Sequence, residues 1–172
     1  MSCSQTLSGI ARDCKGNMGG VAEVYIANRE DVTAVTVTDG KVSAITMASG
    51  KTFQVYQFNR GTASMTSTYN ISAENGTNYV GTDLVLVFSR METSKRIEMT
   101  ALAVNDLYVI VKDANGAYWL LGHDNPVNAG AGDGNTGTAI GDRNGYSITL
   151  HDDSAELPYE VLASIISGLL PA

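Results

Sequence analysis

A polar hairpin in the middle of the chain most constrains the fold. Residues 62–72 read Thr-Ala-Ser-Met-Thr-Ser-Thr-Tyr-Asn-Ile-Ser, the chain turns near Asn75-Gly76, and residues 78–89 return. Both arms are longer than the usual strand of about five or six residues. Only residues 84–88 are apolar enough to enter a core, so we expect the hairpin to project from the body of the domain. Because a lone projecting ribbon is marginal in water, its polar arms are expected to meet another subunit.

The composition of the chain favours β-structure. It holds 16 Thr, 15 Val and 10 Ile among 172 residues, and β-branched side chains suit a pleated sheet. This length fits a single domain, residues 1–172, with a sizeable core. Charged residues make up 17 % of the chain, below the average of about 25 %, so Ser, Thr, Asn and Gly cover the surface or an assembly hides it. The net charge of −7 excludes a general affinity for DNA phosphates or anionic membranes.

Alternating side chains and turn dipeptides predict the other strands. Asp39-Gly40 joins two β-branched runs, residues 32–38 and 42–47, and such a dipeptide is a strong hairpin signal. The remaining strands are expected at residues 21–27, 51–59, 107–112, 117–122 and 146–151, with a short edge strand at 157–161.

Two helices are expected. Ser89 and Glu92 have the spacing of a capping box, which predicts a helix over residues 90–104 that lies on a sheet. A small helix is expected at residues 163–170. The predicted fold class is therefore mainly β: a β-sandwich or barrel with one packed helix, a long projecting hairpin and a short C-terminal helix.

Two segments are expected to be irregular. Residues 1–20 form an N-terminal arm. Residues 124–145 are rich in Gly, Asn and Asp and lack hydrophobic periodicity, which predicts a long loop. Loops of this length are usually functional or mobile. Arg143, near the end of this loop, is expected in a loop salt bridge or a contact between subunits.

No group of residues predicts catalysis, a bound metal or a cofactor. His123 and His151 are each followed by Asp, and two histidines cannot by themselves fill a zinc site. Residues 133–137 resemble the start of a calcium loop, but Thr138 and Asn144 stand where such a loop needs Gly and Glu. The sequence has no Gly-x-Ser-x-Gly turn of the kind that presents a catalytic serine. We therefore expect a protein that is not an enzyme.

A cluster of acids follows the second histidine. Asp152, Asp153 and Glu156 lie close together in the sequence, which is more typical of a solvated turn than of an acid and base pair. Cys3 and Cys14 are expected to be reduced thiols, as in proteins made and assembled in cytoplasm. The N-terminus has no basic and apolar leader pattern, and residues 157–170 are too interrupted to span a bilayer, so we expect no contact with a membrane.

Five segments carry a family likeness. They are residues 16–31 (GNMGGVAEVYIANRED), 65–80 (MTSTYNISAENGTNYV), 84–102 (LVLVFSRMETSKRIEMTAL), 107–122 (LYVIVKDANGAYWLLG) and 137–150 (GTAIGDRNGYSITL). The order of elements adds to it: a sheet-rich body, a long polar hairpin, a helix entered directly from the second arm, and another hairpin. Together they resemble the virion structural proteins of tailed bacteriophages, and among these the tail tube proteins.

This resemblance implies a structural role in the virion tail. Tail tube proteins form hexameric rings whose inner strands join into one barrel, and the rings stack into a conduit for DNA. Here the two hairpin arms would line the barrel, and residues 124–145 or the N-terminal arm would reach the adjacent ring. A barrel shared between subunits has no open sheet edges, which would explain the polar arms. The residues expected at the subunit interface or inner barrel are Met65, Ser67, Tyr69, Ile71, Asn75, Tyr79 and Asp83.

The same resemblance implies partners and a location. The partners are further copies of the chain, other tail or neck proteins, and DNA in transient, non-specific passage. Assembly would take place in the cytoplasm of the bacterial host. A neck or connector ring and a capsid decoration protein are alternatives within the same class. A carbohydrate-binding β-sandwich module is an alternative outside it, and would use Trp119, Tyr118 and the oxygen atoms of residues 124–145.

Overall fold

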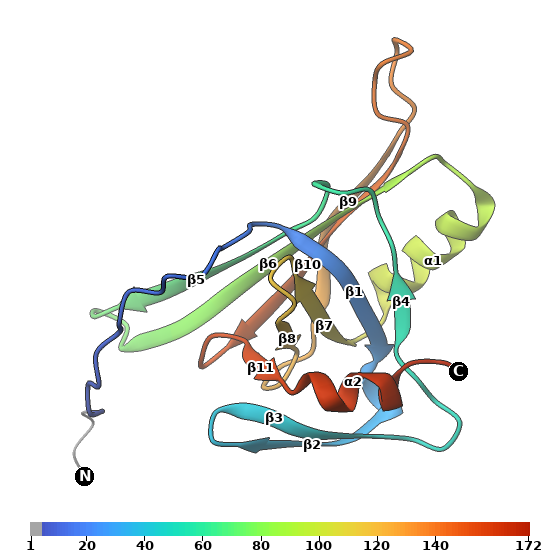
Figure 1. Ribbon diagram of the computed structural model, residues 1–172. Helices are drawn as coiled ribbons and strands as arrows, with labels where there is room; N and C mark the ends of the chain where they lie inside the picture. Colours follow the sequence, from blue (N-terminus) through green and yellow to red (C-terminus); the bar gives the residue numbers. More distant parts are fainter. Residues whose placement is uncertain (1–4) are drawn as a thin grey trace.

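The protein folds into two sheets and two α-helices. The computed structural model describes residues 5–172, so Cys3 lies outside the described part (Figure 1). One sheet has seven strands in the order β2-β3-β11-β8-β7-β1-β4, and the other has four in the order β5-β6-β10-β9. The predicted mainly β, sandwich-like fold with one packed helix and a short C-terminal helix is confirmed.

The seven-stranded sheet contains most of the strands that alternation predicted. Its members are β1 (Val21–Asn28), β2 (Val32–Thr38), β3 (Lys41–Met47), β4 (Gln54–Tyr56), β7 (Leu107–Asp113), β8 (Tyr118–Leu121) and β11 (Tyr159–Val161), with a single 3-10 turn, Arg29–Asp31, between β1 and β2. Asp39 and Gly40 both adopt positive φ, 51° and 75°, which the tight turn between β2 and β3 requires.

The strand at 157–161 was expected at an edge. That expectation is wrong, because β11 pairs with β8 on one side and with β3 on the other.

The four-stranded sheet consists of β5 (Ser64–Ser72), β6 (Thr77–Ser89), β9 (Asn128–Asn135) and β10 (Gly145–Ser154), all antiparallel. The prediction of a loop over residues 124–145 is wrong for β9, whose sequence is Asn-Ala-Gly-Ala-Gly-Asp-Gly-Asn. Side chains this small have no hydrophobic period. The strand forms because its backbone pairs with β10 from Gly145 to His151.

Two cores lie on opposite faces of the seven-stranded sheet. One fills the space between the two sheets and includes Val24, Val109, Leu84 and Leu150, each 0 % exposed. The other lies beneath α2 (Ala163–Leu169) and the β2–β3 hairpin. Burial on both faces explains why β7 begins with five consecutive buried residues instead of alternating.

The packed helix begins later than its capping box predicted. α1 spans Thr93–Val104, its N-cap residue is Glu92, and no side chain caps it. Ser89 is still part of β6, where it pairs with Gly145, so it is unavailable as a cap. The chain turns at Arg90, which has φ of 64°, and Lys95 Nζ donates to the Ser89 carbonyl at 2.6 Å. Sheet pairing therefore overrides the local helix signal.

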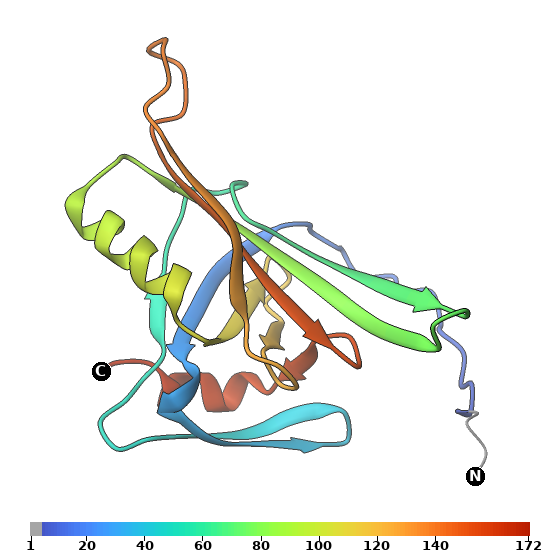
Figure 2. The ribbon, with the colours of Figure 1, turned by 180° about the vertical axis from the view of Figure 1, so that it is seen from behind.

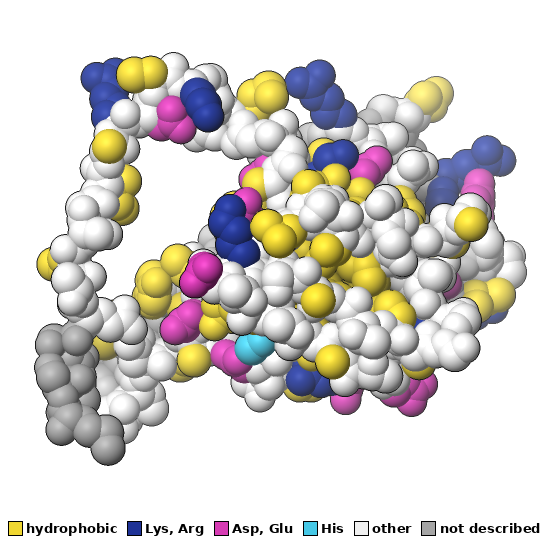
Figure 3. All heavy atoms as spheres, turned by 60° about the horizontal axis from the view of Figure 1, so that its bottom comes forward, with side chains coloured by type: hydrophobic (Ala, Val, Ile, Leu, Met, Phe, Trp, Pro, Cys, Tyr) yellow, Lys and Arg dark blue, Asp and Glu magenta, His cyan; other side chains and the backbone are white. Residues whose placement is uncertain are grey.

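The N-terminal arm stands away from the body of the molecule (Figures 1 and 3). Its base is fixed where the Met18 amide donates to Asn115 Oδ1 at 2.8 Å and the Ala114 amide donates to the Gly20 carbonyl. Leu7 and Ile10 are fully exposed. None of the helices in residues 5–172 is long and apolar enough to cross a membrane.

Candidate assembly surface

The polar hairpin is only partly a free ribbon. β6 pairs with β5 from residue 77 to 85 and with β10 from residue 80 to 89, so its second arm is a central strand for most of its length. The ends of the arms, around the turn, extend beyond the rest of the sheet (Figures 1 and 2). The expectation that both arms lack partners in their own chain is therefore wrong for β6. The outer edge of β5 pairs with no further strand of residues 5–172.

β5 and β9 are the two open edges of this sheet. β5 is nine residues long and pairs with β6 without a register shift. The open edges of the other sheet differ: β4 has three residues, and β2 has two register shifts against β3. Short and bulged edge strands resist pairing with other chains, whereas a long regular one invites it. β5 is thus the best-formed open edge of the described chain.

The two faces of the four-stranded sheet differ sharply in chemistry. One face carries Leu84, Leu86, Ile148 and Leu150 into the core. The opposite face, which we call the polar face, alternates with it. It carries Thr66, Thr68, Asn70, Tyr79, Asp83, Val85, Val87, Asp133, Ser147, Thr149, His151 and Asp153. Hydroxyl and carboxylate groups dominate it, and its aliphatic side chains include Val85, Val87 and Ala131.

The sequence-predicted interface residues fall on both faces. Met65 packs against the core, and Ser67 Oγ lies 2.8 Å from the buried Thr82 Oγ1, so the side chains of both residues contact their own chain. Tyr69 and Ile71 are on the same face but beyond the core, where they are 56 % and 74 % exposed. Tyr79 and Asp83 lie on the polar face.

Asn75 lies in the turn at the end of the hairpin, where its amide donates to Ser72 Oγ. The prediction missed the β10 side chains of the polar face, Ser147, Thr149, His151 and Asp153. The alternation of Ser, Thr and His at 147, 149 and 151 was a signal for a second polar strand. It did not reveal that this strand lies beside β6.

His151 is held between two carboxylates at the centre of the polar face. Its Nδ1 lies 2.6 Å from Asp83 Oδ1, and its Nε2 lies 3.1 Å from Asp153 Oδ1. An ionised carboxylate only accepts hydrogen bonds, so both ring nitrogens donate when both acids are ionised, and the ring is then a cation. The hydrogen bond to Asp83 is the main cause that raises the pKa of His151.

Two further carboxylates, Asp133 on β9 and Asp142 in the loop after it, are held by hydrogen bonds. Asp133 on β9 pairs with Arg143 Nη2 at 2.8 Å, which is the loop salt bridge predicted for Arg143. Asp142 accepts hydrogen bonds from the amides of Thr138 and Ala139, both at 2.8 Å, and these bonds lower the pKa of Asp142.

In residues 5–172, no group of three or more His, Cys, Asp or Glu side chains is arranged to hold a metal ion.

Asp152 points the other way, into the core, and is 2 % exposed. The Gly122 amide donates to its carboxylate, but Oδ1 has no hydrogen-bond partner. Burial raises the pKa of Asp152. The predicted solvated turn is therefore wrong at this position, because β10 continues to Ser154 and its alternation turns Asp152 inward beside Thr82.

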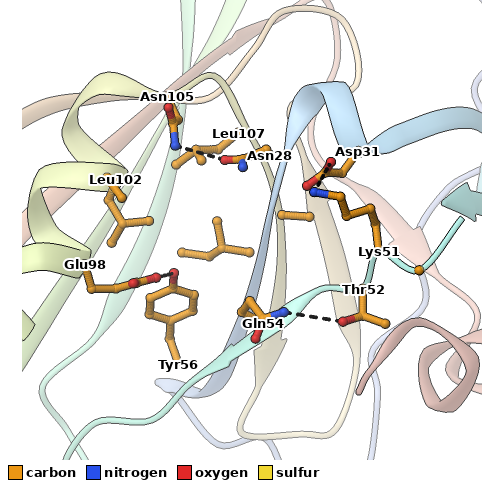
Figure 4. A pocket seen from close by; sticks show the side chains of 14 residues that line it. Asn28, Asp31, Lys51, Thr52, Gln54, Tyr56, Glu98, Leu102, Asn105 and Leu107 are labelled. Carbon is orange, nitrogen blue, oxygen red and sulfur yellow. Dashed lines mark hydrogen bonds and ion pairs between the residues drawn. The ribbon is translucent and has the colours of Figure 1, made fainter. Parts of the chain in front are cut away.

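A cavity of about 270 Å³ lies between β1, β4 and α1 (Figure 4). Its polar side chains already bind one another. Tyr56 donates to Glu98, Asn105 Nδ2 donates to Asn28 Oδ1 at 3.1 Å, and Lys51 pairs with Asp31 at 3.2 Å. Burial and the bond to Glu98 raise the pKa of Tyr56. These contacts stabilise the walls of the cavity and leave few polar groups free to bind a ligand.

The aromatic residues considered for carbohydrate binding are also engaged. Trp119 Nε1 donates to Asp113 Oδ2 at 3.0 Å, and the Tyr118 ring stacks on Tyr25 with centroids 6.2 Å apart. Neither ring is an exposed flat platform, since both residues are half-buried.

No family model, no curated protein and no solved structure matches the chain.

Proposed function

We propose that the chain is a structural virion protein that joins edge to edge into rings, and that these rings stack as a bacteriophage tail tube or tail ring. The observation that carries the proposal is the four-stranded antiparallel sheet with a long open edge on each side, β5 and β9. In this role the protein belongs to the virion tail and assembles in the cytoplasm of its bacterial host. Other tail and neck proteins are then its partners, and DNA passes through without being held.

Strand direction supports pairing between copies. With four antiparallel strands, the two edge strands run in opposite directions. Copies related by rotation about a ring axis all present their sheets in one orientation. β5 of one copy therefore meets β9 of the next as an antiparallel neighbour, which continues the pattern of the sheet.

The stagger of the strands supports closure into a ring. β5 pairs with residues 77–85 of β6, and β9 is aligned through β10 with residues 83–89 of β6. The centres of the two edges, at residues 81 and 86 of β6, are thus offset by five residues. At about 3.4 Å per residue and three strand spacings of about 4.8 Å, this offset corresponds to a tilt of roughly 50°. Strands of closed barrels tilt by about 35–45°, so the two edges come to nearly the same height around an axis.

The resulting barrel would be wide enough for DNA. Six copies of the sheet give 24 strands, with six taken from the resemblance to tail tube proteins. With spacings of about 4.8 Å and a tilt of about 40°, opposite backbones are roughly 50 Å apart. The core face packs against the rest of the chain, so the polar face lines the lumen. Its carboxylate groups repel phosphates, and its hydroxyl groups carry no positive charge that would hold them, which favours passage over binding.

Mass measurement combined with negative-stain microscopy tests this function. Purified protein is expected to form sixfold rings or stacked tubes as its concentration rises. Rings that never stack would favour the neck or connector role within the same class. A chain that stays monomeric at high concentration, and remains folded by circular dichroism, would overturn the proposal.

A further inference from the structure

We infer that a groove between α1 and β9 receives Tyr69 and Ile71 from the neighbouring copy. The inference rests on the proposed ring and identifies the side chains that fix its interface. It concerns the core side of the sheet, which would be the outside of the barrel. Backbone hydrogen bonds join β5 to β9, and the side chains on this side must then fit those of the neighbouring copy.

The groove has a volume of about 520 Å³. One wall is the flank of α1, with Met99, Thr100 and Ala103, and the other is residues 129–134 of β9. Ile148 forms part of its lining. Because β9 carries only small side chains on this side, the groove stays open. A Cβ atom on Gly134 would come within 3.1 Å of the Tyr146 ring, so a larger residue there does not fit without a shift.

Tyr69 and Ile71 are the matching exposed groups. They are 56 % and 74 % exposed and lie on the core side of β5, where Tyr69 stands opposite the buried Val80. Their neighbours on that side of the strand, Met65 and Ser67, are already in contact with Leu84 and Thr82 of β6. Two neighbouring large side chains that stay more than half exposed in their own chain indicate a contact surface.

The register of the strands directs both side chains to this groove. Residues directly opposite each other in paired strands lie on the same face. Gly134 and Gly132 share the core side, because they pair with Tyr146 and Ile148 of β10. If β5 of the next copy overlaps β9 fully, Gly134 lies opposite Met65 and Gly132 lies opposite Ser67. In the same register, Tyr69 lies level with Gly130, which lines the groove, and Ile71 lies level with Asn128, where β9 begins.

Gly130 lines the groove together with Thr100 and Ala103, and Asn128 directly precedes Ala129, which lines it too. The neighbour's two side chains therefore approach the groove near the residue at which β9 begins. Because the faces of β5 and β9 are fixed by pairing within each copy, the register between copies can change only in steps of two residues, and such a step would move Tyr69 from Gly130 to Gly132 or Asn128. The contact therefore also fixes the register of the barrel.

Disulfide trapping between copies tests the contact. In a chain with Cys3→Ser and Cys14→Ser, the pairs Ile71→Cys with Ala103→Cys and Tyr69→Cys with Thr100→Cys are expected to form linked ladders on mild oxidation of assembled rings. Ile71→Cys with Ile97→Cys is the matched control, because Ile97 is exposed on α1 and does not line the groove. The control is expected to give no ladder.

The outcomes of these experiments distinguish a failure of the proposed contact from a failure of the proposed ring. Rings without the expected crosslinks overturn the contact while the ring stands. Protein that never assembles overturns both. Linkage of Ala103→Cys to a cysteine placed at Ile10 would assign the groove to the N-terminal arm and overturn the inference.

Charged variants give a second readout that does not depend on crosslinking geometry. Ile71→Glu is expected to raise the concentration needed for ring formation about tenfold or more, the scale of one lost buried interface side chain. The melting temperature of the monomer should stay the same, because Ile71 is exposed in it. Ala103→Lys combined with Ile71→Glu should restore part of the loss. Unchanged assembly of Ile71→Glu would contradict the inference.

Discussion

Nδ1 of His151 lies 2.6 Å from Oδ1 of Asp83, its direct partner across the pairing of β10 with β6. Asp153 holds the other ring nitrogen at 3.1 Å. The pair joins the two central strands of the four-stranded sheet on the polar face, and its charge depends on pH. Stability is therefore expected to depend on pH as well.

Replacing His151 by Gln tests this dependence. The folded-state pKa of His151 is raised, chiefly by the bond to Asp83, above the value of about 6.5 in an unfolded chain. Protonated His151 therefore stabilises the folded state fully below the unfolded-state pKa, and this stabilisation is lost as pH rises through the folded-state pKa. Because the groups are largely exposed, we expect a loss of less than about 1 kcal/mol for His151→Gln at low pH, shrinking toward zero in alkaline buffer. Urea unfolding at both pH values measures it, and a loss that grows with pH would contradict the assignment.

Asp152→Asn is expected to stabilise the fold at neutral pH. Burial raises the pKa of this carboxyl, so its ionised form destabilises the folded state, and this effect fades as pH falls through the folded-state pKa. The amide oxygen can still accept the bond from Gly122. We expect a gain of about 1–2 kcal/mol in unfolding free energy at pH 7, and less in acid. Asp153→Asn, at an exposed position of the same strand, is the control and should change stability by less than about 0.5 kcal/mol. Equal effects of the two variants would refute the role of burial.

Gly145→Ala is expected to destabilise the protein strongly. A Cβ atom at this position would come within 2.0 Å of the Phe88 carbonyl oxygen, which is held in β6. Relief requires a backbone shift where β10 begins, and we expect a cost of about 2–4 kcal/mol. Gly141→Ala is the matched control, since a Cβ there meets nothing within 4 Å. Thermal unfolding of both variants compares them, and similar melting temperatures would count against this placement of the strand start.

Proline substitutions along β5 test the open edge. Of two successive residues such as Thr66 and Ser67, one directs its amide toward β6 and the other directs it outward. Proline removes the amide, so one variant should lose an internal bond and stability. The other should keep a stable monomer yet fail to form rings. Circular dichroism and mass measurement together distinguish the two, and normal assembly by both variants would exclude pairing through β5.

Several elements follow directly from local sequence patterns. Neighbouring residues predict the Asp39-Gly40 turn between β2 and β3, the alternation in β1, and the helix at the C-terminus. The structure contains all three. In each case the information lies within a few residues of the element it specifies.

The errors share a cause in long-range pairing. β9 was missed because Ala and Gly side chains carry no period, and its formation depends on β10. The capping box failed because Ser89 pairs with Gly145, more than fifty residues away in the chain. Met65 and Tyr79 were assigned to one surface although they lie on opposite faces of the same hairpin.

The sequence by itself determined a mainly β chain, most of its strands, and an acidic, hydroxyl-rich hairpin unsuited to a core. Tertiary structure alone decided that β10 lies beside β6, that β5 and β9 are the edges, and which face of the sheet is polar. The physical reason is that strand pairing uses backbone hydrogen bonds between distant residues, and these groups are the same in nearly every residue. Side-chain patterns specify that a strand forms, whereas the packing of the whole chain selects its neighbour.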